Sequence, residues 1–341
     1  MKIGKLTTEQ LEQSVFSKLK PVRDEVVLRP GVGEDCGALR LGANLCVVST
    51  DPITAAGKEM GRLLVHVCCN DVAACGAEPV GLLISLMAPP ETKQEKIDAI
   101  MQQISETAEQ LQVEILGGHT EITDAVTRMV ASGTVIGSCP DGRLVTTGGA
   151  KPGDDLVLTK WAGLEGTLIM ASDYAPPVIQ QVGMDGYQQC LALNQSLSAV
   201  TDGVTAAKSG AHAMHDVTEG GVLGAVYELC RASGCGVYLI EKNIPVLPET
   251  DRLCHAFTLD PMRLVSSGCM LIAAENGKKM VRDLQAKNVP AAIIGQLKWA
   301  DSGMKIQCAD GMTREMAPPG PDELYRFTQR MADSVVSLNQ G

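Results

Sequence analysis

Acidic residues at four places in the sequence could bind a metal cation together. Three of them follow or interrupt an apolar segment, where burying an unpaired carboxylate would cost several kcal/mol, and the fourth lies in a glycine-rich loop. Such acids need cationic or hydrogen-bonding partners, yet few lysines or arginines lie near them in the sequence. Mg²⁺ fits best, because it prefers oxygen ligands and is usually held by a few carboxylates together with substrate phosphates. The predicted ligands are Asp35 in GVGEDCG, Asp51 after LCVVST, Asp71 on a predicted helix face, and Asp216 in HAMHDVTEGGV.

Each aspartate also has an ordinary structural interpretation. Asp35 could be a turn former in its glycine-rich loop, and Asp51 could begin a turn. Asp71 could be a helix acid with satisfied hydrogen bonds, and Asp216 could cap the helix that follows it. One residue alone is a weak signal, whereas the four together favour a site for metal and phosphate.

The segment GGHTEIT, residues 117–123, places two glycines, a histidine and an acid at the end of a predicted strand. It could be a metal site, a phosphate site or only a polar turn. His119 could donate to a phosphate, accept a proton from a substrate, or fill the turn without a function. His215, beside Asp216, is a second candidate acid or base, or else a packing residue.

The glycines match no standard nucleotide-binding motif. No Gly-Lys pair is followed by Ser or Thr, which excludes a P-loop. Gly31, Gly33 and Gly37 do not have the G-x-G-x-x-G spacing of dinucleotide-binding proteins. Any phosphate would then be held through metal ions and through backbone amides of glycine turns, such as the turn at Gly33.

The composition narrows the class of protein. The 341 residues suffice for two domains, and the 12 cysteines include no Cys-x-x-Cys pair, so we expect reduced core thiols. A net charge of −11 with 3% aromatic residues disfavours nucleic acid as a partner. The longest apolar run, 80–88, is about half of a membrane-spanning helix, and the N-terminus lacks a signal-peptide pattern. We therefore expect a soluble cytoplasmic protein without membrane contact.

Apolar periodicity predicts strands that alternate with helices. Helical spacing covers 58–77 and 92–111, and apolar runs such as NLCVVST, VGLLISLM and RMVASGTVIG indicate strands. Later in the chain, helices are predicted at 164–171, 188–208 and 221–233. This alternation predicts the α/β (α+β) class.

A domain boundary is predicted in GGAKPGDD, residues 148–155, which has three glycines and a proline but no apolar periodicity. We place one domain at 1–149 and a second at 150–341.

Seven blocks, in order, resemble the aminoimidazole ribonucleotide synthetase superfamily, which also contains thiamine-monophosphate kinase, selenophosphate synthetase and a hydrogenase-maturation carbamoyl dehydratase. The similarity runs from about residue 28 to about residue 300, and the hydrogenase-maturation branch is the most similar. The blocks are GVGEDCGAL, VVSTDPI, NDVAACGAEPVGL, ILGGHTEIT, AKPGDDLVLTK, HAMHDVTEGGVLGAVYELCRASGCGVYLIEKNIPV and DPMRLVSSG.

The resemblance implies a fold and a site. The first domain would have a sheet that forms a β-barrel with its copy across a homodimer, and the second a mixed sheet covered by helices. ATP would bind in the cleft between the domains. The resemblance implies that Asp35, Asp51 and Asp71 hold Mg²⁺ at the triphosphate while Asp216 approaches from the second domain. Thr50 and Asn70 would be secondary contacts, and Gly117, Gly118 and Thr120 would form a turn against the phosphates.

The sequence also departs from these relatives. His119 stands where they generally have an acid, although Glu121 could restore the charge. Asp216 and Glu219 could imitate the acid pair of the thiamine branch, whereas the hydrogenase branch has a basic residue near Glu219. The sequence ends SLNQG and its last cysteine is Cys308, so we expect no cyanide formation by the usual route through a C-terminal cysteine.

The sequence therefore predicts a Mg²⁺-dependent ATP-binding enzyme that phosphorylates an oxygen of a small amide, carbamoyl or phosphate-bearing substrate. One alternative is a nucleotide-binding accessory or regulatory homodimer with little catalysis, and another is a phosphotransferase similar to thiamine-monophosphate kinase. A maturation partner protein is a possible additional partner. Four retained acids favour the enzyme, whereas His119 favours the accessory protein.

Overall fold

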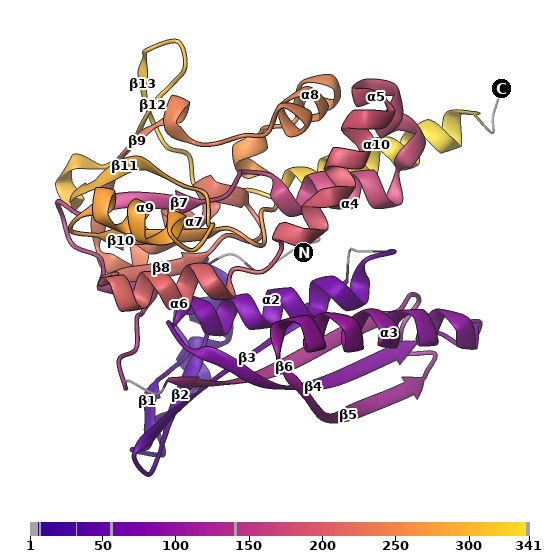
Figure 1. Ribbon diagram of the computed structural model, residues 1–341, viewed down its shortest axis with the longest axis horizontal. Coiled ribbons are helices and arrows are strands. Elements are labelled where there is room, and N and C mark those ends of the chain that lie inside the picture. Colours follow the sequence, from indigo (N-terminus) through magenta and orange to yellow (C-terminus); the bar gives the residue numbers. More distant parts are fainter. Residues whose placement is uncertain (1–5, 7, 32, 55–56, 140–141, 339–341) are drawn as a thin grey trace.

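Two α/β units, each built on one mixed β-sheet, are stacked on one another (Figure 1). The chain passes from the first sheet to the second between Cys139 and Asp155. The predicted α/β (α+β) class is therefore confirmed, while the domain limits 1–149 and 150–341 remain a prediction. The structure is a computed structural model that describes residues 6, 8–31, 33–54, 57–139 and 142–338.

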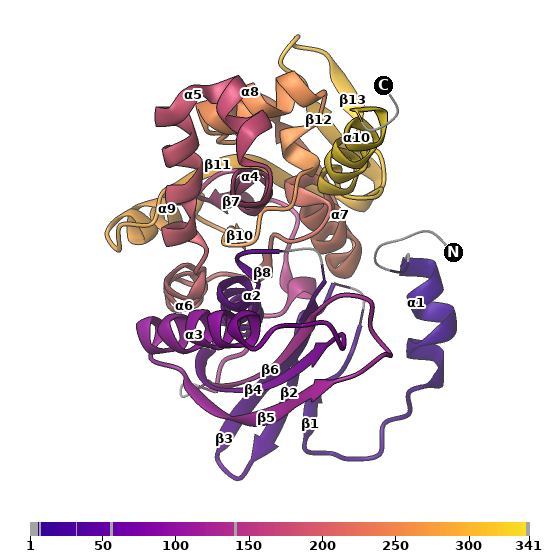
Figure 2. The same cartoon turned by 90° about the vertical axis from the view of Figure 1, so that its right-hand side faces the viewer.

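The first sheet contains six strands. They are β1 (Val26–Leu28), β2 (Gly37–Leu41), β3 (Asn44–Ile53), β4 (Glu78–Ala88), β5 (Glu114–Ile122) and β6 (Val130–Cys139). Their order is β1-β2-β3-β6-β4-β5, and only β4 and β5 are parallel neighbours. Helices α2 (Met60–Ala74) and α3 (Gln94–Leu111) cover one face (Figure 1). Helix α1 (Thr8–Ser14) and the short helix η1 (Phe16–Lys18) lie apart from them, beside β1 (Figure 2).

Side chains of the first sheet alternate between a covered and an uncovered face. In β6 every second residue from Ala131 to Cys139 is buried, as expected when one face of a strand packs on helices. No described helix covers the opposite face, which we call the outer face (Figure 1). By strand register, the outer face carries half-buried or exposed side chains that are mostly small or apolar, including Val48, Thr50, Leu83, Met87, Val130 and Ile136.

The second sheet contains seven strands, in the order β13-β12-β9-β11-β7-β10-β8, with only β12 and β9 parallel. Alternate residues of β7 separate its two faces. Val157 packs in the cluster that includes α6 (Val200–Ser209) and α9 (Gly277–Gln285), whereas Leu156 and Leu158 pack in the cluster that includes α4 (Leu164–Asp173) and α7 (Gly221–Ser233). The strands are β7 (Asp155–Thr159), β8 (Ala213–Asp216), β9 (Cys235–Ile240), β10 (Met270–Ala274), β11 (Ala291–Trp299), β12 (Met304–Gln307) and β13 (Thr313–Glu315).

Helices surround this second sheet. The α-helices are α4 (Leu164–Asp173), α5 (Ala175–Ala192), α6 (Val200–Ser209), α7 (Gly221–Ser233), α8 (Pro248–Phe257), α9 (Gly277–Gln285) and α10 (Glu323–Leu338). The short 3₁₀ helices are η2 (Thr147–Gly149), η3 (Leu193–Ser196), η4 (Glu241–Asn243), η5 (Pro261–Arg263) and η6 (Ala300–Ser302). Among the residues described, no helix is long and apolar enough to cross a membrane.

Helix α2 joins the two units because it packs on the first sheet and on α6. A Cβ at Gly203 of α6 would lie 2.1 Å from the carbonyl oxygen of Ala73, so only glycine allows this approach. Asn70 adds two buried bonds: its amide nitrogen donates to the Leu197 carbonyl at 2.9 Å, and its oxygen accepts from the Ala199 amide at 2.6 Å.

The single helix predicted over 188–208 is wrong. The structure ends α5 at Ala192 and begins α6 at Val200, with η3 between them. The break presents the backbone of Leu197 and Ala199 to Asn70, a contact from the other unit that local periodicity does not contain.

Candidate metal and phosphate site

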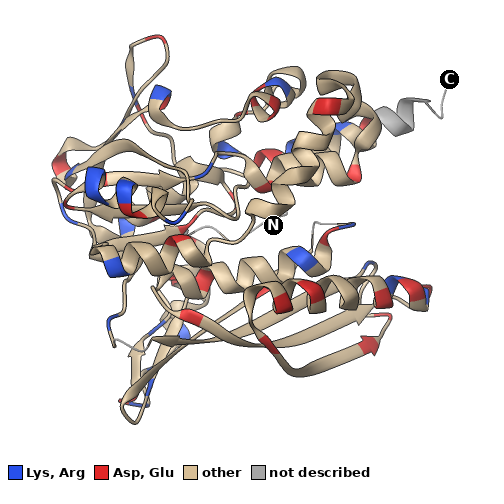
Figure 3. Ribbon diagram, viewed as in Figure 1, with Lys and Arg blue, Asp and Glu red and all other residues tan. Residues whose placement is uncertain are grey.

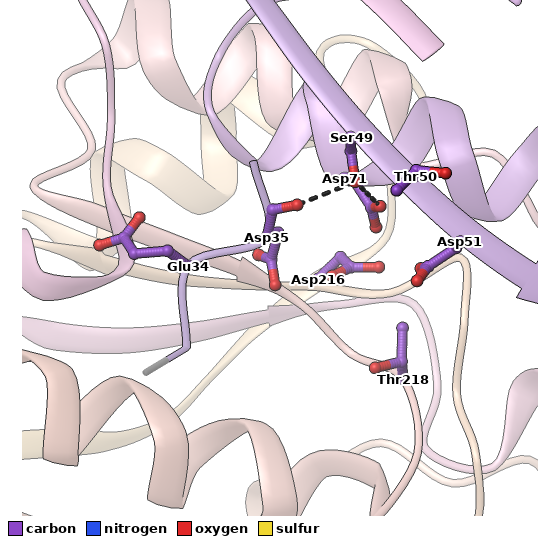
Figure 4. Close-up of a pocket in the computed structure, with 8 residues that line it drawn as sticks. All are labelled: Glu34, Asp35, Ser49, Thr50, Asp51, Asp71, Asp216 and Thr218. Atoms are coloured by element: carbon purple, nitrogen blue, oxygen red, sulfur yellow. Dashed lines mark hydrogen bonds between the residues drawn. The ribbon is translucent and has the colours of Figure 1, made fainter. Parts of the chain in front are cut away.

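A pocket of about 260 Å³ lies where the first sheet and α2 meet the second unit (Figure 4). Both units contribute to it, which brings together side chains up to about 180 residues apart in the sequence. Five of its eight lining residues are acidic, and none is lysine or arginine. The lining residues are Glu34, Asp35, Ser49, Thr50, Asp51, Asp71, Asp216 and Thr218.

Regular structure explains why the carboxylates meet. Strand alternation in β3 puts Ser49 and Asp51 on the covered face, the same face as the buried residues Leu45 and Val47. Asp71 belongs to α2, which is buried along nearly its whole length between the sheet and α6. Asp216 is the last residue of β8, at the edge of the second sheet. Asp35 follows a glycine-rich loop before β2.

Asp71 is buried and surrounded by negative charge. The Ser49 hydroxyl donates to its carboxylate at 2.5 Å and is also within hydrogen-bond distance of the Asp35 carbonyl, at 2.9 Å (Figure 4). Burial, together with the charges of Asp216, Asp51 and Asp35, raises the pKa of Asp71 well above its ordinary value, although the bond from Ser49 opposes this. A cation in the pocket would relieve both the desolvation and the repulsion.

His215 is buried between two carboxylates. Its Nδ1 lies 2.8 Å from Asp35 Oδ2, and its Nε2 lies 2.9 Å from Oε2 of Glu228 on α7. Burial by itself would lower the pKa of His215, but Asp35 and Glu228 outweigh burial and raise this pKa well above its ordinary value. Both ring nitrogens therefore face protein carboxylates, and this geometry does not favour the predicted exchange of protons with a substrate.

Four residues of this region were not predicted. Glu34 and Thr218 line the pocket beside predicted ligands, and burial followed by the charge of Asp35 raises the pKa of Glu34. Ser49 could have been found, because it lies two residues before Asp51 in a strand and thus on the same face. No pattern in the sequence predicts Glu228, because it approaches His215 from a different element, the helix α7.

The GGHTEI segment is not a turn. Residues Glu114–Ile122 form the edge strand β5, which is separated from β3 by two intervening strands, β6 and β4, and thus lies about 14 Å from it. Gly118 has φ +149°, and a Cβ there would lie 1.8 Å from the Ile84 carbonyl oxygen, so its glycine serves the close pairing with β4.

The predicted contacts of this segment with phosphates remain a prediction, because its residues lie outside the lining of the acidic pocket. Gly117, His119 and Thr120 lie in β5 beside Gly118, and none of the four lines the pocket. His119 instead lies 3.3 Å from Glu121, with 69% and 53% of the two side chains exposed. Exposed pairing of this kind contributes little to stability.

Of the remaining predicted nucleotide contacts, one lines the pocket and three lie outside its lining. Thr50 lines the pocket, but its hydroxyl bonds with the Gly133 carbonyl and the Thr134 hydroxyl, each at 3.0 Å. Asn70 and Gly33 are outside the pocket lining, and the Asn70 amide is used between the units as described above. Glu219 also lies outside the lining and accepts a hydrogen bond from Tyr325 at 3.0 Å.

Carboxylates gathered from two units around a cavity form an arrangement suited to metal cations that carry phosphates. Figure 3 shows lysines and arginines scattered over many elements of the chain, among acidic residues. The fold and the site thus define a two-unit α/β protein with an acidic pocket where the units meet.

Two family models match consecutive parts of this chain. Residues 33–139 match the N-terminal domain of AIR synthase related proteins, and residues 151–303 match their C-terminal domain. The chain belongs to this family, which confirms the resemblance seen in the sequence.

Named relatives are consistent with this assignment. A hydrogenase expression/formation protein of Methanocaldococcus jannaschii is 25% identical over 323 residues, 90% of this chain and 92% of the relative. Carbamoyl dehydratase HypE of Cupriavidus necator is 28% identical over 252 residues, 72% of this chain and 69% of the relative. A solved structure of hydrogenase maturation protein HypE in complex with ATP has a TM-score of 0.67, covering 94% of this chain and 97% of that one. At 19% identity, this last likeness shows the shared fold.

Proposed function

We propose that this protein is a Mg²⁺-dependent ATP-using enzyme of the hydrogenase-maturation type, which phosphorylates the oxygen of a carbamoyl or amide group. The observation that carries the proposal is the pocket between the units, where Asp35, Asp51, Asp71 and Asp216 converge. ATP-bound HypE and the carbamoyl dehydratase relatives support the choice of nucleotide and reaction.

The donor set fits Mg²⁺. Carboxylate oxygens predominate in the pocket, and the raised pKa of Asp71 results from burial and from neighbouring negative charge that a cation would neutralise. Asp35, Asp51 and Asp71 would hold Mg²⁺ from the first unit, and Asp216 from the second. Bound Mg²⁺ would neutralise charge on the phosphates during transfer.

The protein's own contribution is positioning. Ser49 fixes the Asp71 carboxylate, and Asn70, the residue before it, fixes α2 against the second unit. Phosphoryl transfer needs little covalent chemistry from side chains, so carboxylates that hold cations and phosphates in place would supply most of what the reaction needs. Phosphorylating a carbamoyl oxygen would turn that oxygen into a leaving group.

We also propose that the protein forms a homodimer through the outer face of the first sheet, with a β-barrel completed across the interface. An uncovered sheet face with Leu83 and Leu116 exposed is an expected interaction surface. His119 and Glu121 share the outer face with Leu83 by register, so dimerisation would bury surface around the GGHTEI segment. A maturation protein is a further proposed partner.

Acceptor-dependent release of ADP tests the proposed reaction. The full-length protein is incubated with Mg²⁺ and ATP, and ADP is measured with a carbamoyl compound, with thiamine monophosphate, or with no acceptor. Release that requires the carbamoyl compound and is lost in Asp51→Asn supports the proposal. Release only with thiamine monophosphate would favour the phosphotransferase alternative, and ATP binding without any release would favour the accessory protein.

A further inference from the structure

Three side chains at the junction of the units place potential metal ligands around one point. Asp35, His215 and Asp216 each offer one donor atom, and these atoms lie within 4.8 Å of one another. Asp35 comes from the first unit, while the other two end β8 in the second. His215 and Asp216 are buried, and Asp35 is largely so, which distinguishes the group from an exposed acidic patch.

Glu228 favours one orientation and tautomer of the imidazole. An ionised carboxylate can only accept, so a ring that binds a metal through Nδ1 would donate its Nε2 hydrogen to Glu228, 2.9 Å away. In the neutral ring, Nδ1 is then a lone pair directed at Asp35 Oδ2, 2.8 Å away. Two acceptors at this distance require a proton or a metal cation between them. A carboxylate that holds the far nitrogen of a histidine is the usual support of a metal-bound imidazole.

The distances suit a single cation. With metal–ligand bonds of about 2.1 Å, two ligands of one ion lie roughly 3 Å apart when adjacent and about 4.2 Å apart when opposite. Nδ1 of His215 is 2.8 Å from Asp35 Oδ2 and 4.0 Å from Asp216 Oδ1. Small side-chain movements would bring all three atoms into coordination.

We propose that Asp35, His215 and Asp216, supported by Glu228, form a site for a first-row transition-metal dication such as Mn²⁺, which shares Asp35 and Asp216 with the proposed Mg²⁺ ligands but not Asp51 and Asp71. An imidazole nitrogen is a ligand for transition metals, whereas Mg²⁺ prefers oxygen alone. The inference deepens the proposed function, because it assigns a second cation to the same pocket. It also gives His215 a role other than acid, base or packing residue.

Without a metal, a proton between His215 Nδ1 and Asp35 Oδ2 would also account for their 2.8 Å separation. The competing role for His215 is therefore a permanent imidazolium that only neutralises Asp35, and this role predicts no bond between a ring nitrogen and a metal.

Pulsed electron paramagnetic resonance of Mn²⁺ tests the site directly. The full-length protein is loaded with Mn²⁺ alone, and electron spin-echo envelope modulation is recorded for coupling to a directly bound nitrogen. We expect such coupling in the wild type. It should disappear in His215→Gln and persist in His212→Gln, a matched control whose ring pairs with Asp154 at 3.0 Å outside the pocket.

Affinities complete the test. Mn²⁺ affinity should fall at least about tenfold in His215→Gln, and about tenfold in Glu228→Gln, where the ring is no longer held by a carboxylate. Bound Mn²⁺ without nitrogen coupling, or coupling that persists in His215→Gln, would overturn the inference. Since the wild-type spectrum is decisive alone, a variant that fails to fold leaves the test intact. Normal Mg²⁺-dependent ATP binding with no nitrogen coupling would reject this site and keep the proposed function. If the wild type showed neither ATP binding nor nitrogen coupling, the site and the proposed function would both be rejected.

Discussion

Two groups of polar residues were predicted to bind ligands: the carboxylates in the pocket between the units, and His119 and Glu121 in the edge strand β5. The two groups differ sharply in burial. In the pocket, Asp71 is buried among other carboxylates, and its pKa is raised. In β5, the His119 and Glu121 side chains are exposed to solvent and lie 3.3 Å from each other. Burial makes charge expensive unless a partner binds, so the pocket is where ligand binding should depend on single side chains.

The largest effect should follow from Asp71→Asn. Removing this carboxylate should lower the affinity for ATP with Mg²⁺ by at least about 100-fold, more than loss of a supporting residue outside the ligand set. Calorimetry measures the change, and Asp98→Asn, an acid exposed on α3, is the control that should bind as the wild type does. Similar affinities for Asp71→Asn and Asp98→Asn would contradict this distinction between buried and exposed acids.

In the metal-free protein, Asp71→Asn should be more stable than the wild type, and the difference in stability should grow as pH rises. Because the pKa of Asp71 is raised in the folded state, the unfolded state holds fewer protons above the ordinary carboxyl pKa of about 4, and stability falls with increasing pH. Asp71→Asn keeps a hydrogen-bonding group beside Ser49 without this charge. Thermal unfolding without metal should therefore show a melting temperature above that of the wild type, with a gap that widens above pH 4. A gap that narrows over this range would show that the charge of Asp71 is stabilising.

A charge on the outer face of the first sheet should separate the proposed dimer. We expect Leu83→Glu to yield a monomer at concentrations where the wild type is dimeric, because dimerisation would bury the added carboxylate. Size-exclusion chromatography with light scattering gives the mass. Met184→Glu, at an exposed position on α5 of the second unit, is the control and should leave the dimer intact. A dimer that survives Leu83→Glu would place the interface elsewhere.

Asn70→Ala should affect stability more than binding. It leaves the buried backbone groups of Leu197 and Ala199 without their side-chain partners, at a cost of about 1–3 kcal/mol. Denaturant unfolding measures this loss, with the exposed Asn243→Ala as control. If Asn70→Ala instead reduced ATP affinity strongly at unchanged stability, the direct nucleotide contact predicted from the sequence would be restored.

The smallest effect is expected from His119→Ala. The side chain is exposed and lies outside the pocket, so ATP affinity should change by less than about twofold. Calorimetry on the dimeric protein decides the matter. A tenfold loss would mean that dimerisation brings β5 to a nucleotide site.

The sequence contained enough to predict the family, the alternation of elements and the convergence of four aspartates. Strand periodicity would also have predicted Ser49 on the same face as Asp51. The sequence could not predict the contacts of Glu228 with His215, or of Asn70 with Leu197, because these contacts join elements whose distance is fixed only by tertiary packing. GGHTEI was misjudged as a turn because paired glycines are typical of turns, whereas here Gly118 allows the backbone of β5 to approach Ile84.

Calorimetric titration of ATP into the metal-free protein, with and without Mg²⁺, tests the central proposal most directly. If buried carboxylates hold the nucleotide through cations, ATP should bind with Mg²⁺ and show no measurable binding without it, since five acidic residues line the pocket. Equal affinity in the two titrations would contradict the proposal that cations bridge Asp35, Asp51, Asp71 and Asp216 to the phosphates.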